Sequence, residues 1–375
     1  TGIAHWLTGI EIISLMPKIA PIIGGLTIPI FYLIVYELFK EKKLALFAAS
    51  FLAVATFHVY QTSHAAPLTI GHFFMMVSIF FFIKFIKKSI YLIPLLISTA
   101  LLIMSHHFTM YFYIISITFM LFGYAQNHSA HWKKSYIILF YVVLASCSAF
   151  LYWIFVATPV YTSFMNGKLI VSSPIIILAY FLSTLFGFFL CMYSSKIKQY
   201  LPKISLDLPS ISLLKKIIII FSTLLILSFL AINTGIPGVY IKLTPIAVAY
   251  SIPMILLASF SLAGFVFLKQ KKNGYLVQTW ILSLVGSFLF SILSAKLMPD
   301  RHLEYLIVPL CIPASITIHF LIHNHTINEV KSLISPQKII HQPHSLKAHI
   351  QTIAIPLIVG SLVIANTMAA YPTVD

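Results

Sequence analysis

Arg301 is the residue whose type and position point most directly to chemistry, because it is the only arginine in a chain with 24 basic side chains. It lies in the segment Pro299-Asp300-Arg301-His302-Leu303-Glu304, directly before an apolar stretch. A guanidinium is planar and permanently charged, and it can donate two parallel hydrogen bonds to a phosphate or carboxylate. We therefore predict that Arg301 binds an anion and that His302 assists it.

Two histidine-rich turns offer further hydrogen-bonding groups. His106 and His107 stand between two apolar stretches in Ser105-His106-His107-Phe108-Thr109, and three more histidines flank an earlier turn: His58, His64 and His72. Polar residues at membrane depth are costly and tend to face protein or a water-filled cavity. If these turns meet the segment with Asp300, Arg301 and Glu304, they form a pocket at the membrane edge that suits the phosphate of a lipid.

Each of these residues also has a purely structural interpretation. A histidine near the end of an apolar span is often an interfacial or helix-capping residue, and Arg301 could form a salt-bridged cap with Glu304 or Asp300. A mixed His/Asp/Glu metal site is a further alternative. Because no diagnostic ligand spacing is present, we expect no metal and no other cofactor, with a divalent ion as the open possibility.

The composition places these residues in a membrane protein. The chain is 60% hydrophobic and 9% charged with a mean hydropathy of +0.99, and apolar stretches recur from end to end. Its net charge of +16 comes from lysines that separate apolar stretches, which excludes a contiguous nucleic-acid-binding arm. All three cysteines fall within apolar stretches, so neither a disulfide framework nor a thiol site is indicated.

The pattern predicts an all-α polytopic membrane bundle of about twelve spans in one domain. The spans are expected near residues 19–39, 44–60, 66–83, 90–104, 106–124, 136–156, 174–193, 217–234, 248–268, 276–295, 303–322 and 351–371. Lysines fill every second connection, with 19 basic residues on one side and five, including Arg301, on the other. The positive-inside rule then makes 194–216 and 323–350 cytoplasmic loops and puts both ends of the chain outside the plasma membrane.

The first 17 residues are expected to be the end of an extracytoplasmic loop. Trp6 and its apolar neighbours predict a helix lying in the interface and ended by Pro17. A polytopic chain that starts outside without a methionine or a signal peptide suggests that a first span and most of an outer loop precede Thr1.

Several segments together resemble the polytopic GT-C glycosyltransferases, which include protein O-mannosyltransferases, aminoarabinose transferases and the oligosaccharyltransferase catalytic subunit. The resemblance rests on a glycine-containing span that ends in Tyr32-Leu33-Ile34-Val35-Tyr36-Glu37-Leu38-Phe39, a lysine turn and an alanine-rich span over 44–60. The segment from Asp300 to Pro309 is similar to a late outer loop of the family, and 105–109 to a turn of archaeal members.

The resemblance implies a transferase that takes a sugar from a polyprenyl-phosphate lipid on the extracytoplasmic face. It implies an inverting displacement in which Arg301, with His106, His107 and His302, stabilises the departing phosphate. The family's catalytic aspartate would precede Thr1, and Glu11, the only acid in the remaining part of that loop, is the candidate that could stand in for it. No second acid stands in the next outer turn, which favours a monosaccharide transferase over a metal-dependent oligosaccharyltransferase.

Two other classes of function stay open at this point. A transporter would carry polar residues near the bilayer midplane or paired broken helices, whereas this chain concentrates them at one mouth. A non-catalytic scaffold or assembly subunit is compatible with a chain in which no catalytic acid is visible. Apart from the sugar lipid, we expect only membrane lipids as partners and no nucleic acid.

Overall fold

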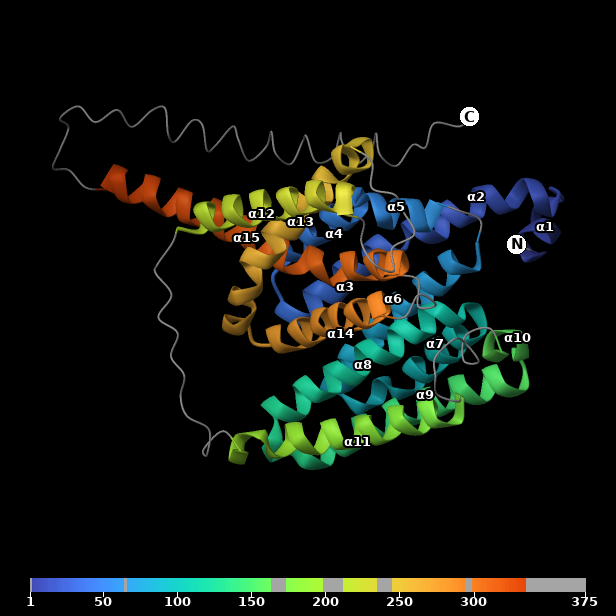
Figure 1. The fold of residues 1–375 in the computed structure, drawn as a ribbon. Coiled ribbons are helices and arrows are strands. Elements are labelled where there is room, and N and C mark those ends of the chain that lie inside the picture. The colour runs from blue at the N-terminus through green and yellow to red at the C-terminus, as the bar shows by residue number, and fades with distance from the viewer. Residues whose placement is uncertain are drawn as a thin grey trace.

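The structure is a computed structural model that describes residues 2–63, 66–162, 173–197, 212–234, 245–293 and 299–334. Every regular element in these ranges is a helix, and the axes of most long helices are roughly aligned with one another (Figure 1). The helices are α1 (Gly2–Thr8), α2 (Ile12–Gly25), α3 (Thr27–Phe39), α4 (Lys42–Val54), α5 (Thr56–Ser63), α6 (Pro67–Lys87), α7 (Leu92–Ser105), α8 (His107–Asn127), α9 (Trp132–Phe155), α10 (Thr158–Val160), α11 (Ser173–Ile197), α12 (Leu213–Thr234), α13 (Pro245–Phe265), α14 (Gly274–Leu293) and α15 (Pro299–Ile334), with short 3-10 turns at Ser89–Tyr91, Ser129–His131 and Val266–Gln270. The expected all-α bundle is confirmed.

Nine helical segments of the described residues are long and apolar enough to cross a membrane, and a bent pair would make ten. They lie in α2–α3, α6, α8, α9, α11, α12, α13, α14 and α15. The chain is therefore an integral membrane protein, as predicted, but the count of about twelve spans is not confirmed. The expected span at 90–104 is a shorter apolar helix, and the one at 351–371 lies outside the described residues.

The span expected at 44–60 is bent in the structure, because α4 and α5 meet at an angle of 65°. Ala55 between them is extended, with φ −69° and ψ 115°. The segment after Ala55 is polar, and His58 and Gln61 are each only 2% exposed. The bend turns these side chains into the protein, where a polar group costs less than it would in lipid.

The interior of the bundle is built around α8 and α15, whereas α11 and α12 are mostly exposed. α15 packs against α13, α14 and α4, and α8 packs against α14, α11 and α9. Gly264 of α13 permits a close approach to α15, since a Cβ there would lie 2.1 Å from the carbonyl oxygen of Pro313. α15 runs to Ile334, so residues 323–334, expected in a loop, are helical.

The N-terminal segment forms two helices instead of one that ends at Pro17. Gly9 breaks the chain between them with a φ of +69°, a conformation that glycine adopts without steric cost. α2 then continues through Pro17 and Pro21, because membrane helices tolerate proline where neighbouring groups satisfy the freed carbonyls. Trp6 is 88% exposed, as an interfacial side chain would be.

The lysine turns of the first half and of the second half lie at the same end of the bundle. Glu37 pairs with Lys40 at 2.6 Å and with Lys87 at 2.9 Å, and Glu41 pairs with Lys271 at 2.6 Å. These pairs join the α3–α4 turn to the end of α6 and to the α13–α14 turn. We call this the lysine end of the bundle.

Candidate functional site

A cavity of about 710 Å³ opens at the end of the bundle opposite the lysine end. Its walls come from the turn before α6, the α7–α8 junction, the end of α9 with the segment that follows, and the first turn of α15. The lining residues are Ala66, Pro67, Leu68, Ile103, Met104, Ser105, His106, His107, Phe108, Tyr152, Trp153, Ala157, Val160 and Arg301.

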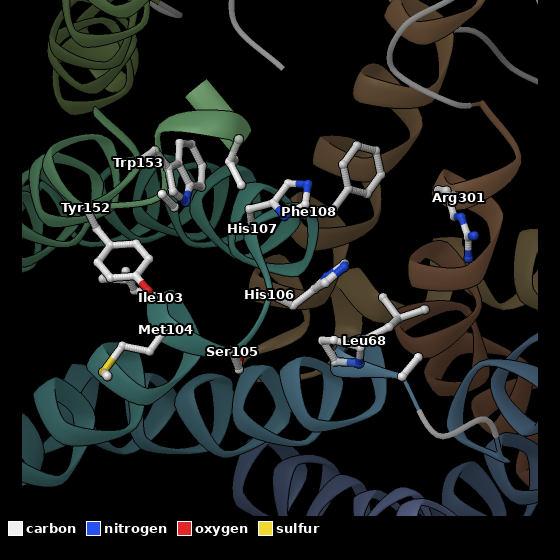
Figure 2. Close-up of a pocket in the computed structure, with 14 residues that line it drawn as sticks. Leu68, Ile103, Met104, Ser105, His106, His107, Phe108, Tyr152, Trp153 and Arg301 are labelled. Atoms are coloured by element: carbon white, nitrogen blue, oxygen red, sulfur yellow. The ribbon is translucent and has the colours of Figure 1, made fainter. Parts of the chain in front are cut away.

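The cavity brings together Arg301, His106 and His107, three of the residues singled out from the sequence. Figure 2 shows Arg301 on one side of the cavity and the two histidines on the other. Arg301 comes from α15, and the two histidines stand about 200 positions earlier in the chain, where α7 turns into α8. The α7–α8 junction and the start of α15 therefore meet at one cavity, as expected from the sequence.

Arg301 is held by Glu304, one helical turn further along α15. Its Nη1 donates to both carboxylate oxygens, at 3.0 Å to Oε1 and 3.2 Å to Oε2. The Glu304 side chain is 8% exposed, whereas that of Arg301 is 39% exposed. The salt-bridged cap considered for Arg301 is therefore present, and it is made by Nη1 of a guanidinium that has five N–H groups.

His106 is the N-cap of α8 and also part of the cavity wall. Its Nδ1 accepts a hydrogen bond from the backbone N–H of Thr109 at 3.2 Å and lies 2.8 Å from the Thr109 hydroxyl. Thr109 Oγ1 in turn lies 2.6 Å from the hydroxyl of Tyr305. Burial, together with the neighbouring His107 and Arg301, lowers the pKa of His106 to about 4, so the ring is neutral at pH 7.

Close packing against α6 fixes the position of His106. A Cβ at Gly71 of α6 would lie 2.6 Å from His106 Cβ and 3.0 Å from Thr109 Oγ1. No other residue type fits there without moving the α7–α8 junction. The absence of a side chain at position 71 is thus part of how the site is shaped.

The structure does not bring His302 into the cavity. Its ring is fully buried, its Nε2 lies 2.8 Å from Ser287 Oγ, and its edge contacts Phe112 with ring centroids 4.8 Å apart. Ser287 Oγ also lies 2.8 Å from the hydroxyl of Tyr111. These contacts tie the first turn of α15 to α14 and α8.

His58 and His72 lie behind the cavity, inside the protein. His58 Nε2 lies 2.9 Å from Thr27 Oγ1, and the rings of His58 and His72 are 5.2 Å apart. The ring of His72 is 5.7 Å from that of Tyr305. Neither histidine lines the cavity.

Three further candidates remain: His64, Asp300 and Glu11. His64 and the side chain of Asp300 lie outside the described residues. Glu11 is exposed at the start of α2, where its side chain makes no capping hydrogen bond. Among the described residues, no three His, Cys, Asp or Glu side chains are close enough to hold a metal ion.

The residues of the site that were not predicted from the sequence include Thr109, Tyr305, Tyr152 and Trp153. Thr109 stands three positions after the N-cap, a spacing that is typical of capping and could have identified it. Tyr152 and Trp153 lie near the end of a span, where aromatic residues are common. Tyr305 offered no signal, because its partner is 196 positions away.

The N-terminal part of the chain matches a known family. Residues 16–153 match the family described as dolichyl-phosphate-mannose-protein mannosyltransferase. The matched stretch contains His106 and His107 and ends before Arg301. No curated protein is similar enough in sequence to count as a relative.

Solved structures with the same fold come from the oligosaccharyltransferase of Archaeoglobus fulgidus. The structure tethered to an acceptor peptide with an NVT sequon has 14% identity and a TM-score of 0.55, covering 95% of this chain and 44% of that one. The complex with an inhibitory peptide and a dolichol-phosphate has 14% identity and a TM-score of 0.55, covering 96% and 45%. The chain thus spans less than half the length of these proteins, and the expected resemblance to GT-C glycosyltransferases is confirmed for the fold.

Proposed function

We propose that this protein is a membrane glycosyltransferase that takes its sugar from a polyprenyl-phosphate donor. The observation that carries the proposal is one cavity that joins Arg301 and His106 to an apolar wall. A polyprenyl phosphate has the matching character, since an anionic group is joined to a long apolar chain. The matched family, named for a dolichyl-phosphate mannose donor, and the solved complex with a dolichol-phosphate support the same class of ligand.

The chemistry assigned to this cavity is stabilisation of the leaving group. When the bond between the anomeric carbon and the phosphate oxygen breaks, the bonding electron pair stays on the phosphate. N–H groups of Arg301 and His106 that face the cavity stabilise this growing charge. Preorganised donors of this kind are effective because they need no reorganisation as the bond breaks. The hydroxyl of the acceptor attacks the anomeric carbon from the opposite face and inverts it, while a carboxylate base takes the proton of that hydroxyl.

The proposed orientation puts the cavity on the extracytoplasmic side. The lysine turns lie at the other end of the bundle, and the positive-inside rule places basic connections in the cytoplasm. Glu37 and Glu41 each offset part of that charge, but the lysine end still holds most of the basic residues.

A transfer assay with the full-length protein in liposomes tests the proposal. Dolichyl-phosphate mannose with labelled mannose is the first donor to use, because the matched family is named for it. We expect release of dolichyl phosphate that depends on the protein and is abolished by Arg301→Gln. Labelled sugar that accumulates inside the liposomes without release of dolichyl phosphate would favour a transporter and overturn the proposal.

A further inference from the structure

The hydrogen bonds around His106 determine which ring nitrogen carries the proton. The backbone N–H of Thr109 can only donate, so Nδ1, its acceptor at 3.2 Å, carries no hydrogen. The Thr109 hydroxyl, 2.8 Å from the same nitrogen, must then donate to it as well. The neutral ring therefore carries its hydrogen on Nε2.

The direction of the hydrogen bond from Thr109 to His106 also determines the direction of the one between Thr109 and Tyr305. Because the Thr109 hydroxyl gives its hydrogen to His106, its oxygen accepts from Tyr305, whose hydroxyl is 2.6 Å away. Tyr305 is 1% exposed, and its ring stacks on Phe112 with centroids 4.0 Å apart. Tyr305, Thr109 and His106 thus form a hydrogen-bond relay. It begins at a tightly packed tyrosine and ends at the His106 ring in the cavity wall.

We propose that Thr109 and Tyr305 are positioning residues that keep His106 in its Nε2–H form, so that the ring donates a hydrogen bond to a phosphate oxygen in the cavity. Figure 2 shows the ring of His106 directed toward the side that holds Arg301. The inference rests on the proposed function for the identity of the phosphate. A histidine in the other form would present an acceptor to the phosphate and repel it.

The chain contains a matched control for this relay. Oγ1 of Thr99 in α7 lies 2.7 Å from the hydroxyl of the buried Tyr141, and Thr99 itself is 3% exposed. This pair repeats the contact of Thr109 with Tyr305 and does not line the cavity. A threonine-to-valine change at either position removes one buried hydroxyl and keeps the shape of the side chain.

Binding of farnesyl phosphate to the full-length protein in detergent, measured by calorimetry, tests the relay. Thr109→Val should weaken binding about five- to tenfold, the effect of one net hydrogen bond, and Tyr305→Phe should weaken it by about half as many fold. Thr109→Ser should bind as the wild type does, and so should Thr99→Val. Equal binding by Thr109→Val and wild type would overturn the proposal.

Two substitutions of His106 separate its two nitrogens. His106→Asn keeps an acceptor near the position of Nδ1 and a good N-cap, but it lacks the cavity donor. It should therefore keep the thermal midpoint and lose binding, whereas His106→Gln should lose some thermal stability and keep more of the binding. If His106→Asn kept both the thermal midpoint and the binding, His106 would act only as a cap and the proposal would be overturned.

A spectroscopic measurement and two further controls distinguish the possible failures. The ¹⁵N shifts of the His106 ring, assigned with His106→Asn, should show a hydrogen on Nε2 in the wild type, and a hydrogen on Nδ1 would overturn the inference. If farnesol binds as well as farnesyl phosphate and Arg301→Gln has no effect, the proposed function fails. If Arg301→Gln weakens binding and Thr109→Val does not, only the relay fails.

Discussion

Arg301 Nη1 lies 3.0 Å from Glu304 Oε1, so the only arginine of the chain is anchored to a carboxylate that is itself buried. The ion pair and the binding role do not exclude each other, because the guanidinium has more donors than one carboxylate contact uses. The anchor sets where the cation stands at the cavity. It also lowers the conformational entropy that a long side chain would lose on binding a ligand.

Arg301→Lys should reduce transferase turnover by about a hundredfold, the usual cost of losing one preorganised charge-stabilising donor. An ammonium keeps the charge and can still reach Glu304, but it lacks the planar set of donors. We expect the thermal midpoint in detergent to change little. A lysine variant with full turnover would show that only the charge matters at this position.

Glu304→Gln provides the contrasting variant. It leaves the guanidinium without its buried counter-charge, so we expect a loss of about 1–3 kcal/mol of stability, seen as a lower thermal midpoint. Turnover per folded molecule should fall less than in Arg301→Lys. If both variants lost stability equally and turnover equally, Arg301 would be a cap alone.

Gly71→Ala should damage the site from the side of α6. The new Cβ would meet His106 Cβ at 2.6 Å, so the α7–α8 junction must move, at a cost of about 1–3 kcal/mol typical of overpacking. We expect a lower thermal midpoint and weaker binding of farnesyl phosphate. Gly286→Ala is the control, because a Cβ there meets nothing within 4 Å, and it should change neither quantity.

The depressed pKa of His106 predicts a loss of stability in acid. The unfolded chain binds a proton at His106 below its usual pKa of 6.5, whereas the folded protein resists protonation down to about 4. Stability is therefore lost as pH falls from 6.5 toward 4. Relative to His106→Asn, the wild type should lose ~2 kcal/mol between pH 7 and pH 5. Thermal unfolding in detergent at both pH values measures the difference, and parallel curves would contradict it.

Cysteine labelling in intact cells tests the orientation. With Cys147, Cys191 and Cys311 replaced by alanine, Ser63→Cys at the cavity end should react with an impermeant thiol reagent. Ser129→Cys at the other end of α8 should react only after the membrane is permeabilised. The opposite result would put the cavity in the cytoplasm and remove the support that the lysine turns give to the proposed orientation.

The sequence was sufficient for the fold class because apolar stretches and alternating lysine turns depend on local composition. The sequence was less informative about where the backbone bends within an apolar stretch. Nothing in the composition of 44–60 marks Ala55 as the site of a 65° bend, since the segment after it packs among distant helices, where His58 and Gln61 are each 2% exposed.

The site was predictable only in part, for a related reason. His106 and His302 look alike in the sequence, as polar residues at the start of an apolar span. One is the N-cap of α8 and lines the cavity, whereas the other lies in the first turn of α15 and is buried against Ser287. Spans that are apolar on all sides carry no periodic signal that would show which polar residues at their start face a cavity.

The pair between Glu41 and Lys271 has a consequence for biosynthesis. Its partners are 230 positions apart, and at about 5–20 residues per second the ribosome needs roughly 10–50 s to make the intervening chain. During that interval the early helices are already in the membrane, and Glu41 has no contact with Lys271. The contact therefore forms late, and a nascent chain stalled before Lys271 would lack this link between the two halves of the protein at the lysine end.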